Sequence, residues 1–276
     1  MGLKAKKRST NLISNVFVWI CAIGCFFPIL WMITTAFKDR VDAFAVPPIW
    51  VFTPKLDNFK AVLSSGNFMK AYKNSLIISI STCLLALLLG TPMAYALARF
   101  KVPNKKKVMM GLLSTKMAPA ILIAVPYYII YQKLGLTGTY TGMIIVYLIF
   151  NLAFTVWMLK GFIEGVPAEL NEAARVDGAS RLKAFFKVEI PLMKGGIAAT
   201  VILCFITVWN EFLLSLVLTS SKTQTTPVAI QNFISFEGIR WGEITAAGVL
   251  VAAPAVLLGI AVRKYLITGL TMGAVK

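Results

Sequence analysis

Four polar residues within long apolar stretches are the first candidates for chemistry in this sequence: Lys116, Asn151, Asn210 and Glu211. A charge near the middle of a bilayer costs at least about 2.5–3.5 kcal/mol on insertion scales. Lys116 is therefore expected to face a partner, with Glu211 as the candidate for an ion pair, or a water-filled cavity. In such a cavity Lys116 would attract an anionic group on a substrate, for example a sulfonate, a phosphate or a uronate. Asn210 and Glu211 either form hydrogen bonds between helices or line a translocation path, to which Asn151 is also assigned.

The sequence offers few residues that are suited to metal binding or to acid–base catalysis. The sequence has no His, which is the commonest general base and metal ligand. It also has no glycine-rich phosphate loop that ends in Gly-Lys-Ser or Gly-Lys-Thr. We therefore expect a chain that is not an enzyme, with no catalytic, metal-binding or cofactor-binding residues, so that ATP is bound by partner subunits. The four cysteines form no Cys-x-x-Cys pair and are interpreted as buried thiols: Cys21, Cys25, Cys83 and Cys204.

The polar segment over about 161–194 has a pattern of helix starts and stops. Pro167 suits the first turn of a helix, and Glu172 favours the positive end of that helix. Gly178 supplies a left-handed stop, and Ser180 can cap a second helix. The pattern predicts a short helix, a glycine turn and a second helix.

The second of these helices carries an apolar stripe. Leu182, Phe185 and Phe186 have helical spacing with basic residues between them, and Pro191 is expected to end the helix. We therefore expect aromatic side chains on an exposed face. Such a face is covered either by the lipid interface or by a groove of a partner protein.

Long apolar stretches would position these residues in a membrane. Of the 276 residues, 58% are hydrophobic and 14% are charged, whereas a soluble chain would have roughly a quarter charged residues. A helix that spans the bilayer needs about 20 mostly apolar residues. The first stretch is too long for a signal peptide and is expected to stay uncleaved. We predict an all-α polytopic membrane protein with six transmembrane helices, over about 12–36, 72–98, 108–132, 140–160, 196–218 and 243–262.

The basic residues predict the orientation of these helices. Of 28 Lys and Arg residues, 18 lie on the side of the two termini, nine lie on the other side, and Lys116 lies within a span. This bias places both termini in the cytoplasm. The positive charge is spread over four cytoplasmic segments and does not form one groove with interleaved aromatic residues, which argues against a nucleic-acid partner.

The segment from Glu172 to Pro191 resembles the EAA loop of ABC importer permeases. That loop has the pattern Glu-Ala-Ala, three residues, Gly, nine residues and then Ile-x-Leu-Pro. Here Glu172-Ala173-Ala174, Gly178 and Val188-Glu189-Ile190-Pro191 stand at that spacing, with Val in place of Ile and Ile in place of Leu. The likeness covers nearly the whole chain and is strongest to carbohydrate-importer permeases of the maltose type. Further segments that resemble this family are Ala94 to Phe100, Trp209 to Phe212 and Gly269 to Lys276.

This resemblance implies the fold of type I ABC importer permeases in the bacterial inner membrane. It implies a cytoplasmic tail over 1–11, a first span with an external loop over 12–71, a permease core over 72–262 and a cytoplasmic tail over 263–276. The implied partners are a second homologous permease, two ATP-binding cassette subunits, an external or periplasmic solute-binding protein and membrane lipid. The residues that it assigns to ATPase coupling are Glu172, Ala173, Ala174, Asp177, Gly178, Arg181, Phe185 and Pro191.

The resemblance further implies a permease subunit that moves a sugar or sugar derivative by alternating access. Relatives commonly have an uncharged polar residue near position 116, so Lys116 departs from the pattern and points to an acidic sugar. Three alternatives stay open: an importer of a non-sugar solute, an ion-coupled secondary transporter and a membrane enzyme. A secondary transporter would need inverted repeats and buried carboxylates, and of the latter only Glu211 is clearly within a predicted span.

Overall fold

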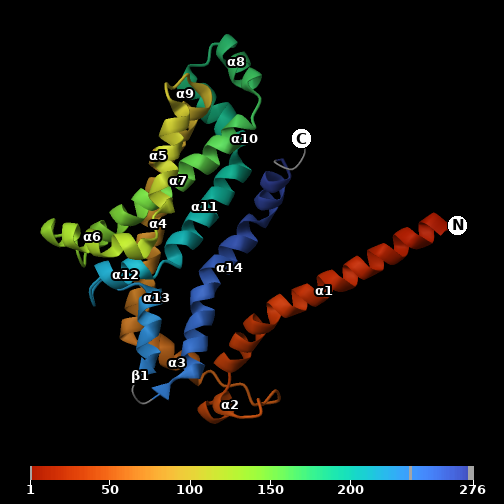
Figure 1. Ribbon diagram of the computed structural model, residues 1–276, viewed down its shortest axis with the longest axis vertical. Helices are drawn as coiled ribbons and strands as arrows, with labels where there is room; N and C mark the ends of the chain where they lie inside the picture. Colours follow the sequence, from red (N-terminus) through yellow and green to blue (C-terminus); the bar gives the residue numbers. More distant parts are fainter. Residues whose placement is uncertain (1, 236–237, 273–276) are drawn as a thin grey trace. The chain divides into compact units, whose positions relative to one another are not determined.

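A computed structural model describes residues 2–235 and 238–272, with side chains over 14–234 and 238–263. It divides into two compact units, Met1–Gly66 with Asn232–Ala252 and Asn67–Gln231 with Ala253–Lys276. Helices make up most of both units (Figure 1). The described strands are β1 (Ile234–Ser235) and β2 (Gly238–Ile239), an antiparallel pair in which Ile234 is opposite Ile239.

In the first unit, hydrogen bonds join the end of a long apolar helix to a short helix that follows it in the chain. The Asn58 amide donates hydrogen bonds to the carbonyl oxygens of Ala36, at 3.0 Å, and Lys38, at 2.7 Å. Lys38 is buried, and its ammonium lies 4.7 Å from the centroid of the Trp31 ring, a cation–π contact. The helices of this unit are α1 (Gly2–Ala36), α2 (Arg40–Phe44), α3 (Asp57–Ser64) and the first part of α14 (Trp241–Met272).

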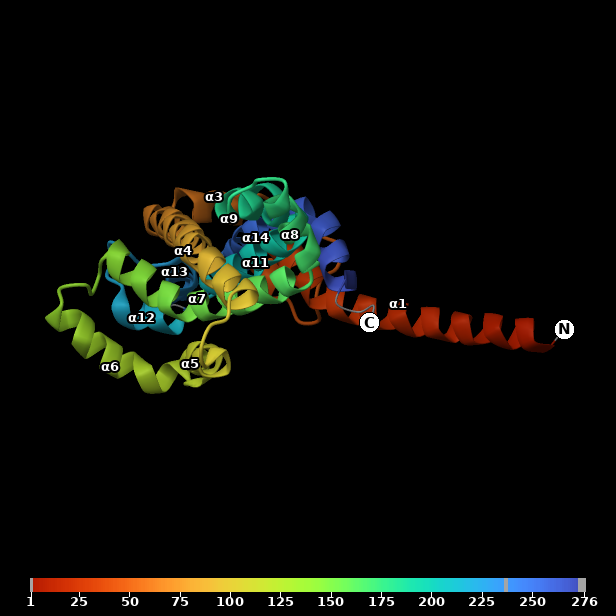
Figure 2. The ribbon, with the colours of Figure 1, turned by 90° about the horizontal axis from the view of Figure 1, so that it is seen from above.

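The second unit is built around α7 (Tyr140–Glu164), against which α5 (Lys105–Met117) and α11 (Lys194–Trp209) pack. Both views show α12 (Leu213–Leu218) beside α6 (Ala120–Lys133), which the contacts between the two helices confirm (Figures 1 and 2). The long α4 (Gly66–Arg99) and the short α13 (Thr226–Ala229), followed by the 3₁₀ turn η2 (Ile230–Phe233), complete this part of the chain.

Apolar side chains of α4 and α7 form the core at one end of this unit. Leu97 of α4 lies buried in one cluster with Leu159 and Ile163 of α7. At the same end α11 approaches α7 closely, because a Cβ atom on Gly196 would lie only 2.3 Å from the ring of Phe162. This core holds the helix ends that position the functional site described below.

The predicted six spans correspond to four continuous helices and up to two bent pairs. The continuous helices are long and apolar enough to cross a membrane over Ser14–Ala36, Gly66–Arg99, Tyr140–Glu164 and Trp241–Arg263. The bent pairs are Lys105–Met117 with Ala120–Lys133, at 91°, and Arg181–Leu192 with Lys194–Trp209, at 75°. The helices at both ends of the chain are longer than predicted, and residues 273–276 of the predicted C-terminal tail lie outside the described residues.

Two predicted spans are wrong as continuous helices. The span predicted over 108–132 breaks because Ala118 has an extended backbone, with φ −70° and ψ 126°, as the residue before Pro119 prefers. The span predicted over 196–218 ends at Trp209, and α12 begins only at Leu213.

The helix that follows the second break, α12, is capped at its start by a carboxylate. Glu211 accepts hydrogen bonds from the backbone N–H groups of Leu214, at 2.9 Å, and Ser215, at 3.1 Å. These are donors that the start of a helix leaves without intrahelical partners. Asn210 and Glu211 therefore lie at a break between two helices and not in the middle of a span.

Candidate functional site

The segment that joins α7 to α11 folds as predicted at its start. It forms α8 (Ala168–Val176) after Pro167, and Gly178 adopts the predicted left-handed conformation with φ +85°. The Ser180 hydroxyl accepts a hydrogen bond from the backbone N–H of Lys183 at 3.3 Å, which caps α9 (Arg181–Ala184). The predicted helix, glycine turn and second helix are confirmed.

The prediction that Pro191 ends the second helix is confirmed to within one residue, because the helical stretch Arg181–Leu192 bends there by 75° into Lys194–Trp209. The chain continues from α9 through a π-helix, η1 (Phe185–Glu189), into α10 (Ile190–Leu192), and α11 begins at Lys194. Pro191 lies in the first turn of α10, where its missing N–H is tolerated. The bond from the Ile190 N–H to the Phe185 carbonyl spans five residues, which is the widened π-type turn.

The predicted aromatic stripe divides between the surface and the interior. Leu182 and Phe186 are 70% and 62% exposed, whereas Phe185 is only 6% exposed. The Phe185 ring lies 4.5 Å from the ring of Tyr95 on α4. Consecutive residues on a helix point about 100° apart, so Phe185 packs inside the unit while Phe186 faces outward. The expectation of an exposed Phe185 is therefore wrong.

An exposed apolar face covers the outer side of this segment, which lies at the end of the unit remote from α12 (Figure 1). Residues assigned to coupling from the sequence accompany it: Glu172, Ala173, Asp177 and Arg181 are exposed, and Ala174 is half-buried. Large exposed apolar groups rimmed by charge are typical of surfaces that bind another protein. The apolar members of this docking face are Leu170, Val176, Leu182, Phe186 and Leu192.

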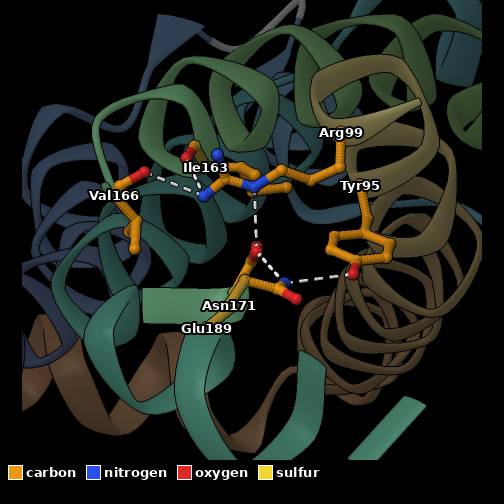
Figure 3. Close-up of polar contacts among 6 residues, drawn as sticks. All are labelled: Tyr95, Arg99, Ile163, Val166, Asn171 and Glu189. Atoms are coloured by element: carbon orange, nitrogen blue, oxygen red, sulfur yellow. Dashed lines mark hydrogen bonds and ion pairs between the residues drawn. The ribbon is translucent and has the colours of Figure 1, made fainter. Parts of the chain in front are cut away.

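The same segment contains a buried carboxylate with polar contacts to side chains of α4 and α8 (Figure 3). Glu189 is 0% exposed. Its Oε1 atom accepts a hydrogen bond from Nε of Arg99 at 2.8 Å and one from the amide of Asn171 at 2.5 Å. A buried charge requires partners of this kind, because its desolvation is otherwise uncompensated. Asn171 is the one buried residue of α8, so this contact attaches α8 to the rest of the unit.

The same network reaches the ends of two long helices. Arg99, the last residue of α4, donates from Nη2 to the carbonyl oxygens of Ile163, at 3.0 Å, and Val166, at 2.8 Å. A guanidinium at the end of α7 also complements the negative end of that helix. Asn171 donates to the hydroxyl of Tyr95 at 3.2 Å. Glu189 of η1 therefore contacts α8 and the end of α4 directly, and Arg99 extends the network to the end of α7.

A small cavity separates α8 from the end of α4. It has a volume of about 150 Å³, and Arg99, Asn171 and Glu172 are among its lining residues. The guanidinium of Arg181 lies 5.2 Å from the ring of Phe100 on the same cavity. Glu172, the acidic residue of the motif, is therefore on the inner edge of the coupling segment as well as at its surface.

Sequence reasoning missed Asn171 and Glu189 as functional residues. Glu189 is the only charged residue between Val188 and Met193, and a lone carboxylate in an apolar stretch is a signal for a buried partner. Its partner Arg99 is 90 positions earlier in the chain, so no local pattern connects the two.

Three of the four predicted pathway residues line a second cavity of about 370 Å³: Lys116, Asn151 and Glu211. Asn210 does not line this cavity. It is exposed, and its amide donates back to the carbonyl oxygen of Ile206 at 3.0 Å.

The candidate ion pair between Lys116 and Glu211 is not formed. The Glu211 carboxylate accepts a hydrogen bond from the Tyr147 hydroxyl at 2.7 Å in addition to its two backbone donors. The Lys116 ammonium lies 5.0 Å from the centroid of the Phe154 ring. Among the side chains that the structure describes, the ion pairs within 4.0 Å do not include Lys116.

Comparison with known proteins connects this arrangement to transport. Residues 86–271 match the profile of a family described as binding-protein-dependent transport system inner membrane component. The diacetylchitobiose uptake system permease protein DasC of Streptomyces coelicolor is 33% identical over 95% of this chain and 96% of its own length. The trehalose/maltose transport system permease protein MalG of Thermococcus litoralis is 32% identical over 93% of this chain and 94% of its own length.

A solved structure supports the fold. A chain of a bacterial ABC transporter involved in the import of the acidic polysaccharide alginate superposes with a TM-score of 0.77. The alignment covers 95% of this chain and 98% of that chain, at 22% sequence identity. The chain therefore has the fold of an ABC importer permease.

Proposed function

The chain belongs to the family of inner membrane components of binding-protein-dependent transport systems, and on this premise we propose that it moves a sugar or a sugar derivative through the membrane by alternating access. The two relatives above are permease proteins of uptake systems for diacetylchitobiose and for trehalose and maltose. The observation that carries the proposal is the docking face on α8 to α10, together with the buried Glu189 contacts that connect it to the long helices.

The proposed mechanism begins at the docking face. ATP-binding cassette subunits cover Leu182, Phe186 and their apolar neighbours, and closure of those subunits on ATP displaces α8. Because Asn171 of α8 and Arg99 of α4 share the Glu189 carboxylate, the displacement reaches α4 and α7. Packed helices respond as rigid bodies, so the cavity lined by Lys116 changes its access from one side of the membrane to the other.

The assembly proposed around this chain contains a second homologous permease, two ATP-binding cassette subunits and an external or periplasmic solute-binding protein. Both termini and the docking face lie in the cytoplasm of a bacterial cell, which the distribution of Lys and Arg supports. ATP is bound by the cassette subunits, which supply the energy for transport.

A pair of matched substitutions tests the docking face. Val176 is 87% exposed on this face, and Val41 is 79% exposed in the external segment of the first unit. Val176→Asp is expected to reduce co-purification of the cassette subunits and ATP-dependent sugar uptake by about tenfold or more, because it places a charge in a desolvated interface. Val41→Asp serves as the control and is expected to leave the association unchanged.

Association and uptake that are unaffected by Val176→Asp would show that the ATPase binds elsewhere. Uptake that persists after ATP depletion, with the ion gradient intact, would favour an ion-coupled transporter instead.

A further inference from the structure

The cavity of about 370 Å³ in the second unit lies where two helices are interrupted. Residues 116–120, at the break between α5 and α6, form one part of its lining, and Glu211, at the break after α11, forms another. Tyr147, Phe150 and Asn151 of α7 complete the lining around them. In membrane proteins, broken helices are tolerated where the freed backbone groups line a cavity, and such breaks are common at solute sites.

The cavity is lined by one ammonium, of Lys116, and one carboxylate, of Glu211, which differ in how far protein groups already satisfy them. Lys116 lies against an aromatic ring and forms no ion pair among the described side chains. Glu211 also lines the cavity, but its carboxylate already accepts three hydrogen bonds, from the hydroxyl of Tyr147 and the backbone N–H groups of Leu214 and Ser215. The ammonium of Lys116 is therefore the charged group that is left for a ligand in this part of the structure.

One further feature favours an anion at the same place, and another favours a sugar hydroxyl beside it. The α6 helix begins at Ala120 on the cavity wall, and its N-cap residue Pro119 provides no side-chain hydrogen bond to its first turn. The positive end of a 14-residue helix thus adjoins Lys116. Asn151 is 3% exposed and lines the cavity, and its Oδ1 atom has no hydrogen-bond partner among the described residues. A buried acceptor without a partner is expected to receive a hydrogen bond from a ligand hydroxyl.

We propose that this cavity binds the anionic group of an acidic sugar, with Lys116 and the N-terminus of α6 at the anion and Asn151 at a sugar hydroxyl. The inference rests on the proposed function and gives its solute a chemical class. The ring of Phe150 supplies an apolar wall for the sugar ring. The volume lies within the range of about 300–1,000 Å³ that is typical of small-molecule sites.

The test measures ligand binding to the assembly of permease and ATPase subunits. The solute-binding protein is left out, so that any binding signal arises from the site in the membrane. Saturation-transfer NMR detects weak ligands, and the probes are glucuronate and glucose, which differ only at C6. Glucuronate is expected to give a stronger response by about tenfold, the factor for one charge-assisted hydrogen bond. A glucose with a sulfonate at C6 distinguishes a carboxylate site from a general anion site.

Three substitutions test whether Lys116 causes the preference for glucuronate over glucose. Lys116→Gln is expected to remove the preference for glucuronate, and Lys116→Arg is expected to keep it because the charge is retained. Lys133→Gln is the control, because Lys133 is an exposed residue at the end of the same helix α6 and does not line the cavity. Its preference is expected to equal that of the unaltered chain.

Equal responses to glucuronate and glucose in the unaltered chain would overturn the inference, as would a preference that survives Lys116→Gln. Loss of both responses in Lys116→Gln, with Lys116→Arg unable to restore them, would show a structural role and would also overturn it.

Uptake of neutral and acidic oligosaccharides by the same transporter, with its binding protein restored, tests the proposed function separately. Uptake of neutral sugars alone would leave the proposed function intact and reject the anion site.

Discussion

Replacing Glu189 with Ala is the perturbation that most directly tests how the coupling segment is attached. The substitution removes the acceptor of two hydrogen bonds, from Arg99 at 2.8 Å and from Asn171 at 2.5 Å. Each charge-assisted bond contributes about 1.5–3 kcal/mol, and loss of one partner of a buried ion pair costs about 3–5 kcal/mol. A loss of about 3 kcal/mol would shift the equilibrium between attached and detached α8 by about two orders of magnitude.

The expected result is a separation of ATPase binding from transport. Glu189→Ala leaves the exposed side chains of the docking face unchanged, so the cassette subunits are expected to co-purify with the permease. Uptake per ATP hydrolysed is expected to fall by about tenfold or more, because α8 then moves without displacing α4 and α7. Hydrogen exchange of the α8 backbone amides measures the detachment directly and is expected to become faster.

Glu164→Gln provides a matched control in the same unit. Glu164 forms two ion pairs, with Lys105 at 3.0 Å and Lys160 at 2.6 Å, but its side chain is 42% exposed. Exposed pairs contribute about 0–1 kcal/mol each, so little change in uptake is expected. Normal coupling and unchanged exchange of α8 in Glu189→Ala would refute the reasoning, and so would equal losses in both variants.

Three further predictions concern the turn and the helix contacts. Gly178→Ala places a side chain at φ +85°, which costs about 1–2 kcal/mol and is expected to weaken co-purification of the ATPase. Gly196→Ala would place a Cβ atom 2.3 Å from the ring of Phe162, so that ring or one of the helices α7 and α11 must shift, and the thermal stability of the purified chain is expected to fall. Cys83 and Cys204 have sulfur atoms 3.4 Å apart, so copper phenanthroline is expected to form a disulfide between α4 and α11, detected by mass spectrometry of the digested chain. No such peptide should arise after Cys204→Ser.

The helix ends in the segment that joins α7 to α11 show what can be predicted from single residues and their near neighbours. Pro167, Gly178 and Ser180 act on their own backbone or on the next few residues, so their types alone predict where α8 ends and α9 begins. Pro191 shows the limit of that approach. The helix does end within one residue of it, but the π-type turn that precedes it depends on the hydrogen bonds of several residues and cannot be predicted from one residue type.

The burial of the aromatic residues and the charges could not be predicted in the same way. Phe185 and Phe186 are adjacent and chemically identical, yet only Phe185 packs against Tyr95. Lys116 and Glu211 were natural candidates for an ion pair, but the Glu211 carboxylate accepts a hydrogen bond from the hydroxyl of Tyr147 instead. In both cases a third residue on another helix decides the outcome.

The class of the protein could be predicted from local patterns in the chain. Long apolar stretches indicate membrane helices, and the spacing around Glu172 and Gly178 indicates two short helices joined by a turn; both depend only on residues close together in the chain. Tertiary structure alone decided which side chains meet, including Arg99 with Glu189 across 90 positions and the two helix breaks that line one cavity. The physical reason is that a contact between helices depends on their rotation and axial offset. These are set by the packing of many side chains at once, so no local pattern of residues specifies them.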